Sequence, residues 1–287
     1  MLDLEVKGHS GCQIEIVREE DGLFVYKSTR DPKYLNRLCL QGQKQQEAAQ
    51  LKLQHIRVPK VFDIKQDKDS VTLKMEYVYS KSFVGYFECA GFEQISYFIQ
   101  ALCLYLDYEV QNSPLQMVKA EVIKTKFDDV KDKIDSNLML KDDEEIKAIL
   151  NRSSELISPL SDLLLPVGKC HGDLTFSNIL FNGNNYYLID FLDSFIESPI
   201  LDIVKIRQDS AYLWSQLMYV GENDTLRLRI VADKVDQEIV KYASQFEWIK
   251  YYPVFQVMNF LRVLQYAKEE RVIRYLKQIL NQLLREF

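Results

Sequence analysis

The chain has 287 residues, 47% of them hydrophobic, and a formal net charge of −6 at pH 7. This length and apolar content can build a sizeable core, while an acidic balance without a long Lys/Arg run makes nucleic acid an improbable partner. No apolar run reaches the roughly 18 residues that a transmembrane helix needs, so no membrane insertion is expected.

Short strands are predicted near the N-terminus. Residues 14–17 and 23–27 are apolar runs joined by the polar turn 19–22, and Lys27 ends the second run. The preceding segment 7–12 contains Gly8, Ser10 and Gly11, which could let backbone N–H groups approach a phosphate. A plain turn is an equally good interpretation of that segment.

A helix and two further strands follow. Residues 33–53 are helix-compatible and contain a single acidic residue, Glu47. Residues 61–64 and 71–75 alternate like paired strands, and Glu76 to Val78 then lead out of them. We place a domain boundary here, which gives an N-terminal lobe of residues 1–78 and a C-terminal lobe of residues 79–287.

The second lobe is predicted to be mainly helical. Apolar residues recur at helical spacing in residues 92–110, and residues 141–157 form a second such pattern, whereas 117–138 is polar and mixed in charge, typical of a helix with an insertion. Ser198 and Pro199 are a typical helix start, with serine as N-cap and proline in the first helical position. Further helices are expected at 225–244, 252–268 and 271–286. The predicted fold class is therefore α+β, a small antiparallel β lobe with a larger helical lobe.

One segment carries the chemistry. His171-Gly172-Asp173 is followed by Asn178 and then by Asp190. Between the last two, 179–181 and 186–189 are apolar runs around the turn-forming segment Asn182-Gly183-Asn184-Asn185, which predicts a hairpin. Such a hairpin would bring Asp190 back beside Asn178.

This spacing suits phosphoryl transfer from ATP. The reaction needs a group that orients the attacking hydroxyl and a metal that neutralises phosphate charge. Asp173 can accept the hydroxyl proton, and Asn178 and Asp190 offer the hard oxygen ligands that Mg²⁺ prefers. Each fragment alone also fits an ordinary turn or strand end, but together they indicate an ATP-dependent, Mg²⁺-dependent kinase.

The motif resembles that of the aminoglycoside phosphotransferase/choline kinase family, relatives of the protein kinases. The resemblance implies a two-lobed protein-kinase-like fold with ATP in the cleft, Asp173 as catalytic base, and Asn178 and Asp190 as magnesium ligands. It also implies that Lys27 contacts the ATP phosphates and that a helix glutamate, here Glu47, holds it in place. Backbone groups around Glu76 and Val78 would bind adenine. Gly172 is nearer to the antibiotic and metabolite kinases of this family.

Other positions follow from the same resemblance. Asp202 is the candidate for an aspartate that braces the catalytic loop, with a helix-dipole role as the alternative. Leu192 stands where protein kinases have a glycine, which favours a constitutively assembled site. Asp193 is expected to face the cleft and contact the acceptor or a second metal ion. Other candidates for acceptor contact are the residues Glu197, Tyr212, Trp214, Tyr219, Trp248, Tyr251 and Tyr252.

Three function classes remain open. The favoured one is a small-molecule kinase that phosphorylates a hydroxyl of a sugar, amino sugar or amino alcohol, with an aminoglycoside-resistance enzyme as a variant. The others are a protein kinase-like enzyme and a non-catalytic nucleotide-binding regulator. Five cysteines, an odd number without CxxC spacing, argue for reduced thiols, and the start Met1-Leu2-Asp3-Leu4-Glu5 does not look like a signal peptide. A cytoplasmic location is therefore expected.

Overall fold

The N-terminal region is an antiparallel sheet. The computed structural model describes residues 6–7 and 12–285. Its main sheet has the strand order β1-β2-β3-β6-β5, formed by β1 (Val6–Lys7), β2 (Gln13–Glu19), β3 (Gly22–Thr29), β5 (Val61–Gln66) and β6 (Val71–Glu76). The predicted strands at 14–17, 23–27, 61–64 and 71–75 are thereby confirmed, each one somewhat longer than its apolar run.

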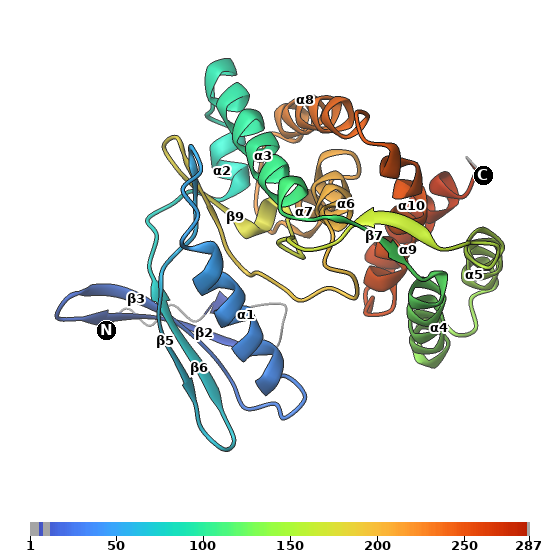
Figure 1. Ribbon diagram of the computed structural model, residues 1–287, viewed down its shortest axis with the longest axis horizontal. Coiled ribbons are helices and arrows are strands. Elements are labelled where there is room, and N and C mark those ends of the chain that lie inside the picture. The colour runs from blue at the N-terminus through green and yellow to red at the C-terminus, as the bar shows by residue number, and fades with distance from the viewer. Residues whose placement is uncertain (1–5, 8–11, 286–287) are drawn as a thin grey trace.

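One helix packs on this sheet. Helix α1 (Leu35–Ala48) lies across β3, β5 and β6 (Figure 1). Leu38 of the helix and Leu73 of β6 are both buried in the small core between them. Gly42 allows this close approach, because a Cβ atom at its position would lie 2.7 Å from the Leu73 side chain.

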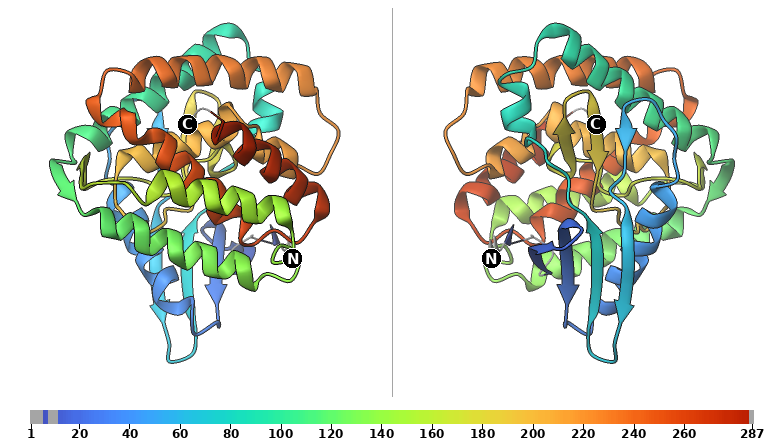
Figure 2. Two further views of the ribbon diagram at one scale, coloured as in Figure 1. Left: turned by 90° about the vertical axis from the view of Figure 1, so that its right-hand side faces the viewer. Right: turned by 90° about the vertical axis from the view of Figure 1, so that its left-hand side faces the viewer.

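The rest of the chain is mainly helical and lies at the other end of the molecule (Figures 1 and 2). Helix α6 is central to it, because it packs against α3, α8 and α9. The helices are α2 (Phe83–Phe87), α3 (Phe92–Gln111), α4 (Ala120–Ser136), α5 (Glu144–Ile157), α6 (Pro199–Ser210), α7 (Trp214–Met218), α8 (Thr225–Ala243), α9 (Tyr252–Leu264) and α10 (Glu270–Leu283). The predicted α+β class is confirmed, with the sheet in the N-terminal region and the helices in the larger C-terminal part.

Two small sheets were only partly predicted. Strands β9 (Ile179–Asn182) and β10 (Asn185–Leu188) form the expected hairpin, and β4 (Ile56–Arg57) joins it alongside β10. Strand β7 (Leu115–Val118) pairs with β8 (Leu163–Pro166), so the helix expected from residue 117 begins only at Ala120. The sequence did not reveal this pair because its partners lie far apart in the chain.

Aromatic packing fixes the hairpin to the helices. Phe181 of β9 stacks on Tyr86 of α2 with ring centroids 4.4 Å apart, and Phe98 of α3 lies 5.1 Å from Tyr186 of β10. All four rings are buried. The hairpin that carries Asn178 and leads to Asp190 is therefore anchored in the main core. In the part of the chain that is described, no helix is long and apolar enough to cross a membrane.

Candidate active site

The β9–β10 hairpin brings Asn178 and Asp190 together. Leu188 pairs with Ile179 across the hairpin, and the backbone N–H of Ile189 donates to the carbonyl of Asn178 at 3.0 Å. The two residues therefore sit at adjacent ends of the paired strands. Asp190 has φ 61°, a left-handed backbone conformation that turns the chain sharply where the strand ends.

Asp173 is held between an amide and an amine. The Asn178 Nδ2 donates to the Asp173 carbonyl at 2.8 Å and to its Oδ2 at 2.9 Å. On the other side, the Lys205 Nζ lies 3.0 Å from Oδ1. Burial alone would raise the pKa of Asp173, but the positive charge and hydrogen bond of Lys205, with smaller contributions from His171 and Asn178, together outweigh it, so the pKa is lowered. Asp173 is therefore ionised at neutral pH. Sequence reasoning missed Lys205, since it lies 32 residues beyond Asp173 in the chain (205 − 173).

Helix α6 braces the loop that carries Asp173, as expected for Asp202. The buried Asp202 carboxylate accepts hydrogen bonds from the backbone N–H groups of His171 and, at 2.9 Å, of Gly172. About two helical turns after Asp202, the Asp209 carboxylate accepts a hydrogen bond from the backbone N–H of Phe176 at 2.6 Å. Two buried carboxylates of one helix thus hold the loop on either side of Asp173.

Gly172 is required by a close backbone contact. Its φ is +90°, and a Cβ atom there would lie 2.2 Å from the carbonyl oxygen of Leu192. The backbone N–H of Leu192 in turn donates to the His171 carbonyl at 2.9 Å. The loop that carries Asp173 and the loop after Asp190 therefore touch directly, and no side chain fits between them.

Lys27 reaches the site from the sheet, but its partner differs from the prediction. Lys27 is buried on β3, and its Nζ lies 2.7 Å from Asp190 Oδ1 and 3.4 Å from Gln41 Oε1. The expected ion pair with Glu47 is wrong: Glu47 pairs with Lys169 at 3.3 Å, with 69% of its side chain exposed. Six helical residues separate Gln41 from Glu47, a rotation of about 240° that turns Glu47 away from the sheet. Glu47 was predicted because it is the single acidic residue of the helix, but the buried polar residue that faces Lys27 is Gln41.

The expected adenine contacts divide into two groups. The backbone N–H of Glu76 is already engaged, because it donates to the carbonyl of Lys60 at 2.8 Å, and the Glu76 side chain accepts from the backbone N–H of Lys60 at 3.0 Å. Within residues 6–7 and 12–285, the backbone N–H and C=O of Val78 have no hydrogen-bond partner. A free donor and acceptor of this kind can bind a purine edge. Gly8, Ser10 and Gly11 lie outside the described residues.

The oxygen atoms left over at the hairpin suit a magnesium ion. Among the described residues, neither the Asn178 Oδ1 nor the Asp190 Oδ2 has a hydrogen-bond partner. Both are hard ligands, and Mg²⁺ in nucleotide sites takes one or two such protein ligands with phosphates and water completing its shell. In the part of the chain that is described, no cluster of three or more His, Cys, Asp or Glu residues offers another kind of metal centre.

The predicted acceptor residues do not gather at one place. Asp193 is close to the site, with its Oδ1 3.3 Å from the Arg37 Nε of α1. Glu197 instead binds Lys44 of α1 at 2.6 Å and accepts from the backbone N–H of Ser194. Trp248 is buried, and its ring stacks on that of Phe246 in the core.

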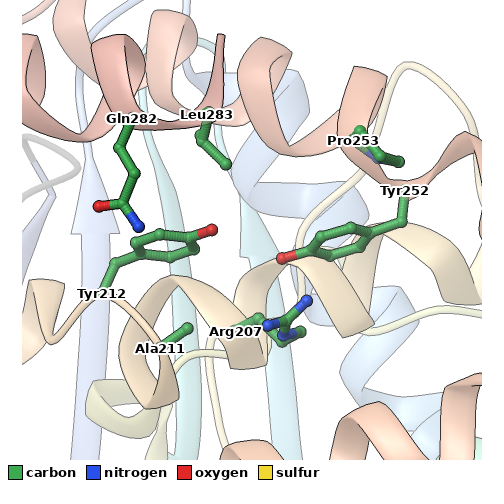
Figure 3. Close-up of a pocket in the computed structure, with 7 residues that line it drawn as sticks. All are labelled: Arg207, Ala211, Tyr212, Tyr252, Pro253, Gln282 and Leu283. Carbon is green, nitrogen blue, oxygen red and sulfur yellow. The ribbon is translucent and has the colours of Figure 1, made fainter. Parts of the chain in front are cut away.

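Tyr212 and Tyr252 belong to a separate cavity. They line a space of about 360 Å³ between α6, α9 and α10, together with Arg207 and Gln282 (Figure 3). Arg207 follows Lys205 by two residues, about 200° around the helix, so the cavity opens on the side of α6 that faces away from Asp173. Arg207 is engaged with Asp236 at 2.9 Å. The expectation that these tyrosines contact the acceptor is not supported by this placement.

Sheet, helices and site together define a class of protein. An antiparallel sheet with a buried lysine lies over a helical region, and the sequence His-Gly-Asp, Asn and Asp lies where the two meet, which is the arrangement of protein-kinase-like phosphotransferases. A sequence profile of the phosphotransferase enzyme family matches residues 24–229, which is more than half of the chain. The chain belongs to this family and is a phosphotransferase.

Solved structures support the same fold. Aminoglycoside phosphotransferase APH(4)-Ia, in a ternary complex with ADP and hygromycin B, superposes with a TM-score of 0.65 at 9% identity, over 99% of this chain and 93% of that one. Amicoumacin kinase hAmiN, in complex with AMP-PNP, Ca²⁺ and Ami, has a TM-score of 0.62 at 13% identity, over 98% of this chain and 88% of that one. A kanamycin and GDP complex of an aminoglycoside phosphotransferase has a TM-score of 0.62 at 13% identity, over 98% and 92%. A search of curated proteins found no significant match.

Proposed function

We propose that this protein is an ATP-dependent small-molecule kinase that transfers the γ-phosphoryl group to a hydroxyl of a sugar, amino sugar or amino alcohol. The observation that carries the proposal is the position of Asp173, an ionised carboxylate that is fixed by Asn178, the residue whose carbonyl accepts from Ile189 next to Asp190. The structural neighbours bound to nucleotides and small antibiotics support the same reaction class.

The nucleotide would be held by residues of both lobes. The free backbone groups of Val78 would bind the adenine edge, and Lys27 would exchange Asp190 for the α- and β-phosphates. Asn178 and Asp190 would hold Mg²⁺, which supplies charge neutralisation on the phosphates when bound. We accordingly propose a division into lobes near residue 78, with the nucleotide between them.

Asp173 would act on the acceptor. Its carboxylate would accept a hydrogen bond from the attacking hydroxyl, orient it in line with the γ-phosphoryl group and take its proton as the new P–O bond forms and the bond to the ADP oxygen breaks. Lys205 keeps Asp173 ionised for this role. Its ammonium group, 3.0 Å from Asp173, would also stabilise the negative charge of the transferring phosphoryl group.

Other features agree with a metabolic enzyme. Only eight residues separate Asp190 from the start of α6 at Pro199 (191–198), which leaves little room for the activation segment of a protein kinase.

The five cysteines are free, which supports the proposed cytoplasmic location.

The test is transfer of label from γ-³²P-ATP, with Mg²⁺, into a small-metabolite extract, with protein removed before counting. We expect label in a low-mass product with the wild type and none with Asp173→Asn, which keeps the shape but not the base. The matched control is Asp129→Asn, which removes a carboxylate from the surface of α4. It should retain full activity.

The alternatives give different results. Label in a protein fraction and none in metabolites would show a protein kinase-like enzyme. Nucleotide binding without transfer to any acceptor would indicate a regulator. Equal activity of wild type and Asp173→Asn would refute the assignment of the catalytic base. Running GTP beside ATP identifies the phosphoryl donor.

A further inference from the structure

Three carboxylates, one in the loop 171–178 and two in the loop 191–198, each have a cation of this chain as partner. Asp173 pairs with Lys205 at 3.0 Å, Asp193 with Arg37 at 3.3 Å and Glu197 with Lys44 at 2.6 Å. A polycationic acceptor would have to displace these internal cations before it could bind the carboxylates. The site therefore does not present the unpaired negative charge that recognition of a polyamine sugar needs.

One more cation lies beside this group. Arg262, near the end of α9, is half-buried, and its guanidinium lies 5.5 Å from the ring centroid of Phe195. Phe195 belongs to the loop that follows Asp190, two residues beyond Asp193. Arg262 is thus placed against the loop that lines the site.

Arg262 has no carboxylate of its own. Within residues 6–7 and 12–285, its guanidinium makes no hydrogen bond and no ion pair. Its direct contact there is the cation–π interaction with the ring of Phe195. Lys205, Arg37 and Lys44 each form an ion pair with one acid, whereas Arg262 forms none and only lies within the electrostatic reach of Asp173 and Asp193. An arginine without a carboxylate partner keeps its forked N–H donors available for an anionic ligand.

The electrostatic surroundings of Arg262 agree with the absence of an ion pair. Burial lowers the pKa of the guanidinium, and the charge of Asp173 is the largest influence that opposes the effect. Arg262 is therefore close enough to the catalytic carboxylate to feel it, yet Asp173 is already paired with Lys205. Arg262 is therefore available to bind an anion near the reacting hydroxyl. Its planar guanidinium can donate two parallel N–H hydrogen bonds to the oxygens of a carboxylate or a phosphate.

We propose that the acceptor carries an anionic group, a carboxylate or a phosphate, which Arg262 binds while Lys205 and Asp173 engage the neighbouring hydroxyl. This inference rests on the proposed kinase function and deepens it, because it names the substrate class. It also separates this chain from phosphotransferases that act on polycationic aminoglycosides.

The experiment sorts acceptors by charge before the reaction. A nucleotide-depleted metabolite extract is divided by electrophoresis at pH 7 into an anionic pool and a neutral-plus-cationic pool. Each pool is then incubated with γ-³²P-ATP, Mg²⁺ and the wild-type protein. A third arm uses anionic pool that has been treated with phosphatase, which is removed before the kinase is added.

The expected result is label only in product formed from the anionic pool. Loss of that label after phosphatase identifies a phosphorylated acceptor, and retention identifies a carboxylate. Label only from the neutral-plus-cationic pool would overturn the inference and leave the kinase function standing. Absence of label from every pool, with Asp173→Asn and wild type alike, would overturn the kinase function and this inference with it.

Variants then test Arg262 directly. Arg262→Gln should raise the KM for the anionic pool about tenfold or more, because a charge-assisted contact is lost, while KM for ATP stays unchanged. Arg262→Lys should have an acceptor KM between those of the wild type and Arg262→Gln. Rising salt should increase the acceptor KM of the wild type more than that of Arg262→Gln. The control is Arg274→Gln on α10, whose side chain is 71% exposed. An unchanged acceptor KM in Arg262→Gln would refute the role of this residue.

Discussion

The Lys205 Nζ lies 3.0 Å from the Asp173 Oδ1, so that α6 supplies a cation directly to the residue that we propose as the catalytic base. The same helix supplies Asp202 to the backbone of His171 and Gly172. Helix α6 therefore controls both the position of the catalytic loop and the charge of its aspartate.

Removal of Lys205 should change the pH dependence of the reaction. In Lys205→Met, the amine no longer opposes the effect of burial on Asp173, so the pKa of Asp173 should rise. A larger fraction of Asp173 is then protonated at a given acidic pH. The acidic limb of the kcat/KM profile should move to higher pH, and kcat should fall about tenfold to a hundredfold. Lys205→Arg, which keeps the charge, should stay near the wild-type profile. An acidic limb that does not move in Lys205→Met would contradict the coupling.

Lys27 and Glu47 should have very different importance. Lys27→Met removes the buried amine that faces Asp190 and should reduce kcat/KM by about a hundredfold or more, as expected for loss of a phosphate-binding cation. Glu47→Gln breaks only an exposed ion pair with Lys169 and should change kcat/KM by less than about twofold. Initial rates at varied ATP measure both. A large loss of activity in Glu47→Gln would show that the helix rearranges to bring Glu47 to Lys27.

Gly172→Ala should destabilise the fold. The methyl group would lie 2.2 Å from the Leu192 carbonyl oxygen at a φ of +90°, and the cost should exceed about 3 kcal/mol because backbone must move. Gly183→Ala is the matched control, since φ is also positive (+58°) but nothing lies within 4 Å. It should cost only about 1–2 kcal/mol. Urea unfolding of the two variants measures the difference, and equal losses would mean that the loop yields easily.

Glu109 should make stability depend on pH. Burial, and next the charge of Asp202, raises the pKa of Glu109 well above its usual range. The folded protein therefore keeps a proton that the unfolded chain releases. The stabilising contribution is fully present below the usual glutamate pKa and is lost as pH rises toward the raised value.

Glu109→Gln carries no such proton. Its free energy of unfolding, relative to wild type, should therefore increase between pH 5 and pH 8, as measured by urea titration at each pH. Glu144→Gln, at an exposed position of α5, should follow the wild type at both values. A constant difference between Glu109→Gln and wild type would indicate that Glu109 is ionised in the folded protein.

Much of the fold could be predicted because its signals are local. The alternating runs at 14–17 and 71–75 predicted strands, and the Asn-Gly turn predicted the hairpin that joins Asn178 to Asp190. The strand pair β7–β8 could not be predicted, because its two short strands lie far apart in the chain and no local turn joins them.

By itself, then, the sequence determined the chemistry that is possible. His171-Gly172-Asp173, Asn178 and Asp190 lie within one short stretch, and a single hairpin is enough to assemble them. The partners of these residues were decided by tertiary packing. Gln41 rather than Glu47 faces Lys27, Lys205 reaches Asp173, and Arg262 lies beside the loop after Asp190. These residues come from separate helices, and which helix face turns toward the site depends on how the whole core packs. The charge that surrounds the acceptor is for that reason a property of the folded structure.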